Sequence, residues 1–291
     1  MYETIVVPHD GSDCASGAVG VAVQFADLFD ADISLLAVLE PYMLSLRESP
    51  PADPDPGDLD DDWRRTLSRT RSHAQAADVP CSTTVVVGDP REAIPVHADD
   101  VDADLVAIGT HGRSGIERLI LGSVTERLLR TADLPLLTVS EIKGTHKVDD
   151  ILVPTDGSSG SDRALTHACS LARRYDATVH GLAVVNTQAL AAVGEAGGAI
   201  PEVIRVQREN RERDLETVRQ RAAAHDLEYT TTVVEGTPDQ VINTYADTND
   251  IDVISMGTHG RSGIDRFLRG SVTERTIRAS SVPVLTMPLE D

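Results

Sequence analysis

One long segment occurs twice in this chain, and this repeat constrains the fold more than any other feature. Residues 109–127 read GTHGRSGIERLILGSVTER, and residues 257–275, 148 positions further along, read GTHGRSGIDRFLRGSVTER. A second pair, VVPHDGS at 6–12 and LVPTDGS at 152–158, has an offset of 146 residues. Matches this close at one long period mean that a single structural unit has been used twice. We therefore expect two tandem domains, not a solenoid of short repeats.

The length of 291 residues fits two domains, at 1–141 and 149–291, joined by a linker at 142–148. Each domain would hold roughly 145 residues, which is enough to bury its own core. In each half, short runs of β-branched and apolar residues alternate with helical patterns. The expected strands are 4–8, 33–39, 81–87, 104–110 and 135–140, then 151–155, 178–185, 230–234, 252–258 and 282–287. This alternation predicts an α/β fold with a doubly wound parallel sheet and helices on both faces in each half.

The charge excludes some classes of partner. A net charge of −21 disfavours nucleic acid and anionic lipid, which require a basic surface. The chain has only two lysines, Lys143 and Lys147, and arginine supplies its other basic side chains. This pattern favours adaptation to a high-salt, halophilic cytoplasm, and the alternative is an ordinary acidic protein. No apolar stretch approaches the ~18 residues of a membrane span, so we expect a cytoplasmic protein.

The candidate site lies where two segments of each half should converge. In a doubly wound sheet, ligands bind beyond the carboxyl ends of the strands, at the point where the strand order reverses. One segment ends the first strand (Pro8, His9, Asp10 and Gly11, or Pro154, Thr155, Asp156 and Gly157), and the other is the glycine-rich loop after the fourth strand.

That loop has the composition of a phosphate-binding segment. Gly109 and Gly112, like Gly257 and Gly260, let the backbone approach a ligand closely. Nine residues later, Gly122 and Ser123, or Gly270 and Ser271, open a helix whose N-terminal N–H groups suit an anion. Thr125 and Thr273 add a hydroxyl in the first turn of that helix.

Two common nucleotide motifs are absent from the sequence. There is no GxxxxGK[ST] motif, and GTHGRSG differs from GxGxxG and follows the fourth strand instead of the first. Helix capping is the alternative role for Asp10 and Asp156. His111 and His259 lack a spaced partner, so they are expected to stabilise the loop or neighbour a phosphate instead of binding metal. The Arg/Glu-rich helix at 205–221 is expected to be a solvated face with paired charges.

The strand ending in Asp, followed by G-x-x-G, nine residues and G-S-V-T-E, resembles the universal stress protein family in its ATP-binding, tandem form. The resemblance covers nearly the whole chain, once per half. It implies a five-stranded parallel sheet of order 3-2-1-4-5 in each domain. His9 departs from the Thr or Ser common at this place in the family, whereas Thr155 agrees with it.

The resemblance also implies an adenine-nucleotide site in each half. Asp10 and Asp156 would bind the ribose end of ATP, and the backbone of Val38 and Val184 would meet the adenine edge. The remaining residues would flank the nucleoside or hold phosphates: Ile108, Gly109, Gly112, Arg113, Gly122, Ser123, Val124 and Thr125 in the first half, and Met256, Gly257, Gly260, Arg261, Gly270, Ser271, Val272 and Thr273 in the second. ADP, AMP or a cyclic nucleotide are alternatives to ATP, and Mg²⁺ could bridge the phosphates.

These expectations describe an ATP-binding regulatory protein of the stress response. The alternatives are a slow Mg²⁺-dependent ATP hydrolase and an interaction module with vestigial pockets. No dedicated base and no lysine accompany the phosphate loop, which argues against efficient catalysis. The apolar last strand of each half suggests an internal pseudo-dimer of the two halves, with further pairing into a homodimer as an extension. The sequence does not identify a protein partner.

Overall fold

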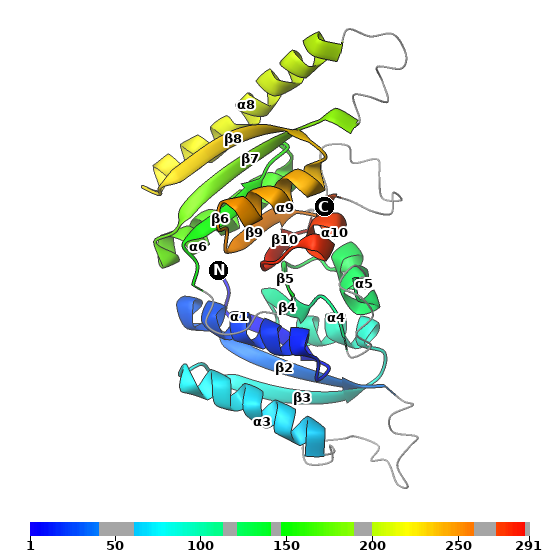
Figure 1. Ribbon diagram of the computed structural model, residues 1–291. Helices are drawn as coiled ribbons and strands as arrows, with labels where there is room; N and C mark the ends of the chain where they lie inside the picture. Colours follow the sequence, from blue (N-terminus) through cyan, green and yellow to red (C-terminus); the bar gives the residue numbers. More distant parts are fainter. Residues whose placement is uncertain (41–60, 113–120, 141–146, 189–199, 259–271, 289–291) are drawn as a thin grey trace. The chain divides into compact units, whose positions relative to one another are not determined.

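The computed structural model describes residues 1–40, 61–112, 121–140, 147–188, 200–258 and 272–288 (Figure 1). The chain divides into two compact units, Met1–His146 and Lys147–Asp291. No helix in the described ranges is both long and apolar enough to cross a membrane.

The first unit alternates strands and helices. Its elements are β1 (Thr4–His9), α1 (Asp13–Phe29), β2 (Asp32–Leu39), α3 (Asp61–Ala76), β3 (Cys81–Val87), α4 (Pro90–Asp100), β4 (Leu105–Gly109), α5 (Ser123–Thr131) and β5 (Leu136–Val139).

The second unit repeats this order. Its elements are β6 (Asp150–Pro154), α6 (Ser159–Tyr175), β7 (Thr178–Asn186), α8 (Ile200–Ala224), β8 (Tyr229–Gly236), α9 (Pro238–Thr248), β9 (Val253–Gly257), α10 (Val272–Ala279) and β10 (Val284–Met287).

Each unit contains five parallel strands in the expected order. The first unit reads β3-β2-β1-β4-β5, and the second reads β8-β7-β6-β9-β10. In the first unit the chain moves from β1 outward to β3 and then returns past β1 to β4. Since crossovers between parallel strands are right-handed, this reversal places α1 and α3 on one face and α4 and α5 on the other. The contacts α1–α3 and α4–α5 agree, so the predicted doubly wound fold is confirmed.

The central strands are buried because helices cover both faces. In β1, every residue after Thr4 is buried, and in β4 all five residues are buried. The edge strands β3 and β8 are half-buried or exposed along most of their length. The strand ends next to the reversal point therefore belong to buried strands, β1 and β4 in the first unit and β6 and β9 in the second.

Aspartate takes the left-handed backbone positions that follow the helices. Six aspartates have φ between 49° and 59°: Asp30, Asp78 and Asp102 in the first unit, and Asp176, Asp226 and Asp250 in the second. Glycine is the usual residue at such a position, and Asp is among the few others that tolerate it. The six form three matched pairs, so the repeat extends to the conformation of single residues.

Candidate functional site at the carboxyl ends of the strands

The turn after the first strand is built in the same way in both units. Gly11 and Gly157 have φ of 86° and 75°, which favours glycine. The Gly157 N–H donates to the Thr155 hydroxyl at 3.1 Å, and the Gly11 N–H donates to His9 Nδ1 at 2.9 Å. His9 therefore replaces the hydroxyl acceptor with a ring nitrogen, although it departs from the Thr or Ser of the family pattern. Because Nδ1 accepts, this ring carries no proton there.

Serine, not the neighbouring aspartates, caps the helix that follows. Ser12 accepts from the Ala15 N–H at 3.1 Å, and Ser158 accepts from the Ser161 N–H at 3.3 Å. Ser12 is the N-cap of α1, and Asp13 is its first residue.

Asp10 and Asp156 order the turn from the preceding position. Asp10 Oδ1 accepts from the Ser12 N–H at 3.0 Å, and Asp156 Oδ1 accepts from the Ser158 N–H at 3.0 Å. Asp10 Oδ2 points to the glycine-rich loop, since a Cβ added to Gly112 would lie 2.7 Å from it. These carboxylates therefore bind the N–H groups of the capping serines and do not themselves cap the helices.

The glycine-rich loop leaves the fourth strand in close contact with the first helix of its unit. A Cβ on Gly109 would lie 2.8 Å from Ala15 N and from Cys14 C, and one on Gly257 would lie 2.7 Å from Gly160 C. The Ser12 hydroxyl also donates to the His111 carbonyl at 3.3 Å, which joins the two loops of the first unit. In the first unit, the two predicted segments therefore converge.

The helix after this loop starts without a side-chain cap. Gly122 is the N-cap of α5, and its own N–H donates to the Thr110 carbonyl at 2.8 Å. Ser123 is exposed and Val124 is half-buried. Helix α5 has nine residues, and the side chain at its N-cap offers no oxygen to the N–H groups of the first turn. Such N–H groups can bind an anion.

The threonine hydroxyls of that first turn have a structural role. Thr125 is buried and donates to the Gly109 carbonyl at 2.9 Å, and Thr273 donates to the Gly257 carbonyl at 2.9 Å. A hydroxyl donated to a carbonyl ties the helix to the strand end. Because both hydroxyl protons are donated to carbonyl oxygens, the donors available to a phosphate here would be main-chain N–H groups.

The other predicted residues lie at the same end of each sheet. Pro8, Ile108 and Met256 are buried, while Pro154, Val38, Val184 and Val272 are half-buried. Val38 is next to last in β2, beside the end of β1. Arg113, Gly260, Arg261, Gly270 and Ser271 lie outside the described residues.

His111 lies in the loop after β4 and is half-buried. Its Nδ1 lies 2.9 Å from the Thr110 hydroxyl, and its Nε2 is buried without a partner among the described residues. Within those same ranges, no group of three or more His, Cys, Asp or Glu side chains could hold a metal ion. His259 lies outside them.

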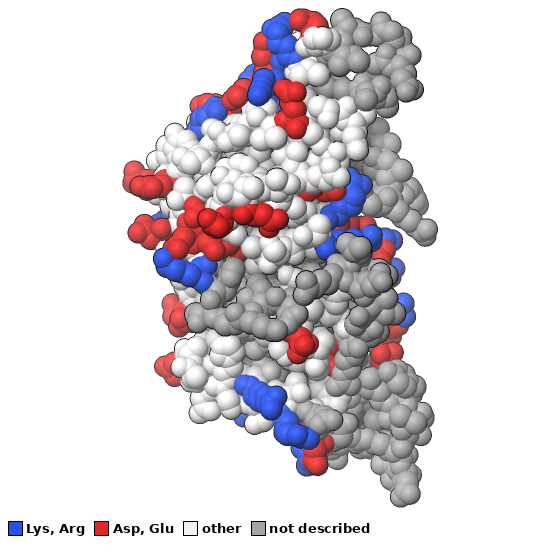
Figure 2. All heavy atoms as spheres, viewed as in Figure 1, with Lys and Arg blue, Asp and Glu red and all other residues white. Residues whose placement is uncertain are grey.

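One pair of site residues was not predicted. On α8, Arg205 forms exposed pairs with Glu202 and Glu209, as expected of a solvated face, and Figure 2 shows acidic and basic side chains interleaved along this helix. Arg211 and Asp214 contradict that expectation, because their side chains are only 14% and 6% exposed. Arg211 Nη1 donates to the Asp156 carbonyl at 3.2 Å. A helical pattern of mixed charges carries no signal of such a contact, because it joins residues 55 positions apart.

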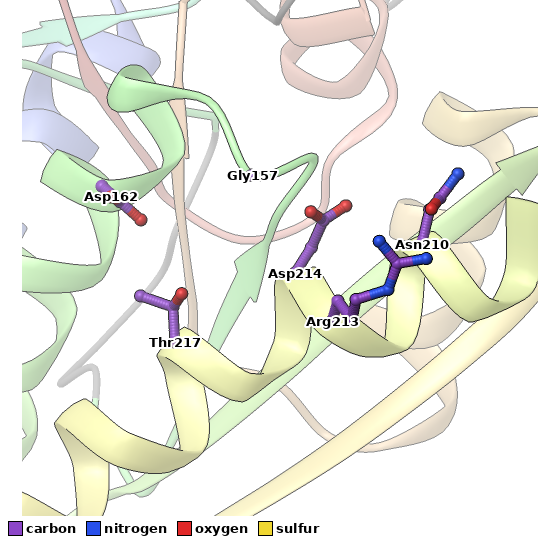
Figure 3. A pocket seen from close by; sticks show the side chains of 6 residues that line it. All are labelled: Gly157, Asp162, Asn210, Arg213, Asp214 and Thr217. Atoms are coloured by element: carbon purple, nitrogen blue, oxygen red, sulfur yellow. The ribbon is translucent and has the colours of Figure 1, made fainter.

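A polar cavity of about 300 Å³ lies beside the same turn of the second unit (Figure 3). Gly157 and Asp162 line it from the turn and the first part of α6. The remaining lining residues come from α8: Asn210, Arg213, Asp214 and Thr217.

Comparison with known proteins gives a consistent assignment. A universal stress protein of Methanocaldococcus jannaschii is 33% identical over 144 residues, half of this chain and 84% of that protein. One of Mycolicibacterium smegmatis is 25% identical over 97% of this chain and 96% of its own length. The crystal structure of a universal stress protein from Archaeoglobus fulgidus shares the fold, with a TM-score of 0.72, 22% identity and coverage of 99% of this chain and 97% of that one. Residues 1–140 and 147–288 each match the universal stress protein family, and the chain therefore belongs to that family as a tandem protein.

Proposed function

We propose that each unit binds one adenine nucleotide, with ATP as the leading candidate, and that occupancy regulates the protein in the stress response. The observation that carries the proposal is the convergence in the first unit. There the Asp10 carboxylate faces Gly112, and the uncapped start of α5 follows the same loop. A carboxylate suits ribose hydroxyls, and free helical N–H groups suit phosphate.

The turns also support two sites instead of one. His9 and Thr155 accept the same turn hydrogen bond, and Asp10 and Asp156 make the same contact to the following serine. The substitution that most distinguishes the two sequences at this point therefore leaves the geometry of the turn unchanged. We expect both units to bind, with affinities that differ.

The test is isothermal titration calorimetry, in which Mg²⁺-ATP is titrated into nucleotide-stripped protein at low and at high KCl. Wild type is expected to bind two nucleotides. Asp10→Ala and Asp156→Ala should each lose one site or weaken it at least tenfold, since each removes a hydrogen bond to a charged group, worth about 1.5–3 kcal/mol. Asp13→Ala is the matched control, because it removes an exposed carboxylate three positions from Asp10.

Failure of folded wild type to bind ATP, ADP, AMP or cyclic AMP would refute the proposal and leave the interaction module. Two undiminished sites in the Asp10→Ala/Asp156→Ala protein would refute the assigned residues. Phosphate release measured in the same samples separates the two remaining functions. Turnover abolished by the double substitution would make the protein a slow hydrolase, and binding without turnover would support regulation.

A further inference from the structure

On α8, an ion pair between half-buried Arg211 and buried Asp214 contacts the main chain of the candidate site in the second unit. Arg211 Nη1 lies 3.0 Å from Asp214 Oδ2, and the same nitrogen donates to the Asp156 carbonyl at 3.2 Å. The contact with Asp214 is an ion pair without hydrogen-bond geometry, so charge attraction holds the guanidinium group while its Nη1 donates to the Asp156 carbonyl. Asp214 thus holds the arginine, and the arginine holds the residue that orders the turn.

The first unit has different residues at the corresponding positions. Helices α3 and α8 align at the offset of 148, because Leu67 and Leu215 are both buried in this register, as are Ala74 and Ala222. Arg211 then corresponds to Trp63, which is 4% exposed. Asp214 corresponds to Thr66, which is half-buried. An uncharged pair in one unit is therefore replaced by an ion pair in the other.

The cavity explains why a direct hydrogen bond matters at this turn. Figure 3 shows the Asp214 side chain extending from α8 toward the loop that carries Gly157, with the cavity lined by both elements. A loop beside a cavity has fewer packing contacts to hold it in one conformation. The bond from Arg211 to the Asp156 carbonyl crosses from α8 to this loop and restrains the residue next to Gly157.

Stability alone is a weak reason for such a pair. Removing two charges from water costs several kcal/mol, and apolar replacements of a buried ion pair are often neutral or stabilising. Geometry is the stronger reason, because a fixed main chain at Asp156 also fixes where its carboxylate points. We propose that Arg211, held by Asp214, is a positioning residue that preorganises Asp156 for ligand binding in the second unit. The proposal rests on the nucleotide function given above.

The first test does not need a nucleotide. The amide of Gly157 is bonded to the Thr155 hydroxyl and that of Ser158 to Asp156 Oδ1, so their hydrogen exchange reports on the turn directly. In the full chain, Arg211→Met with Asp214→Leu should speed exchange of both amides about tenfold or more, since a hydrogen bond from a charged donor is lost. Both partners are replaced because a single substitution would leave a buried charge unpaired.

Two arginines on the same helix provide controls. Arg213→Met removes an exposed charge that lines the cavity. Arg221→Met removes a contact between α8 and α6, in which the arginine donates to the Asp162 carbonyl at 2.8 Å. Arg221→Met should lower the unfolding temperature yet leave the exchange of Gly157 and Ser158 unchanged, which separates positioning from general stabilisation.

The second test measures affinity in an Asp10→Ala background, where only the second unit is expected to report. Arg211→Met/Asp214→Leu should weaken ATP binding about tenfold. Arg211→Lys keeps the positive charge but loses the planar guanidinium group, and it should weaken binding less. If the double variant does not fold, Arg211→Lys alone decides through the same two measurements. Unchanged exchange or unchanged affinity in a folded variant would overturn the proposal. If the Asp10→Ala protein binds no ATP, the nucleotide function fails for this unit, and exchange alone then decides whether Arg211 holds the turn.

Discussion

Gly109→Ala should destabilise the first unit because the end of β4 has no room for a methyl group. The new Cβ would lie 2.8 Å from Ala15 N and Cys14 C and 2.9 Å from Cys14 Cβ. Ordinary contacts begin near 3.4 Å, so α1 and β4 would have to separate by about 0.6 Å. Two of the three neighbours are main-chain atoms, and no side-chain rotation relieves them. We expect a loss of about 1–3 kcal/mol in the free energy of unfolding.

Gly88→Ala is the matched control. It has nothing within 4 Å of the added Cβ, and neither glycine has a positive φ, so alanine fits the backbone at both positions. Both substitutions restrict the unfolded chain to the same degree, so their difference isolates the steric clash. Urea unfolding followed by circular dichroism measures this difference, and calorimetry should show the unfolding temperature lowered by about 3–10 °C. If the two variants unfold within about 0.5 kcal/mol of each other, the close packing of β4 against α1 does not explain the glycine.

Three further predictions concern single side chains. Ser12→Ala should cost about 1 kcal/mol of stability through loss of the N-cap, and a urea midpoint equal to wild type would contradict the capping contact. Burial lowers the pKa of His97 from its ordinary 6.5, despite the opposing charge of Asp100. The unfolded chain therefore gains its proton at higher pH, so stability should fall as pH drops below about 6.5. His97→Gln should flatten the plot of urea midpoint against pH below about 6.5. An unaltered slope in that range would show that His97 does not cause the loss of stability. Burial raises the pKa of the Cys169 thiol to about 11, although Arg221 opposes the shift. Iodoacetamide at pH 8 should then alkylate Cys169 at least tenfold more slowly in folded than in urea-unfolded protein, and equal rates by mass spectrometry would show an accessible thiolate.

Local patterns were sufficient for the tandem organisation and for the alternation of strands and helices. The repeat required two similar units, and the β-branched, apolar runs at 4–8 and 151–155 predicted strands. The family resemblance added the strand order 3-2-1-4-5, which the strand pairing confirms.

The sequence predicted where the candidate site lies in the fold but not how its side chains are oriented. The ends of β1 and β4 had to meet beside the reversal point of the sheet, so Asp10 and the glycine-rich loop could be brought together from sequence. The direction in which each hydroxyl and carboxylate points could not be predicted from the sequence. The sequence suggested Thr125 as a phosphate ligand and could not show that its hydroxyl donates to the Gly109 carbonyl, 16 positions away. His9 looked like a departure, but its ring nitrogen accepts the bond that a Thr155 hydroxyl accepts in the other unit.

The sequence by itself therefore determined the tandem organisation, the order of strands and helices along the chain, and the edge of the sheet at which Asp10 and the glycine-rich loop meet in the first unit. Those features follow from periodicity and from contacts between near neighbours. Only the tertiary structure decided that Asp214 is buried, that Arg211 is mostly shielded from solvent, and that the arginine reaches Asp156, 55 positions earlier in the chain. The reason is physical. Charged residues on a helix follow the same pattern whether they face water or a distant loop, and only the packed chain distinguishes the two.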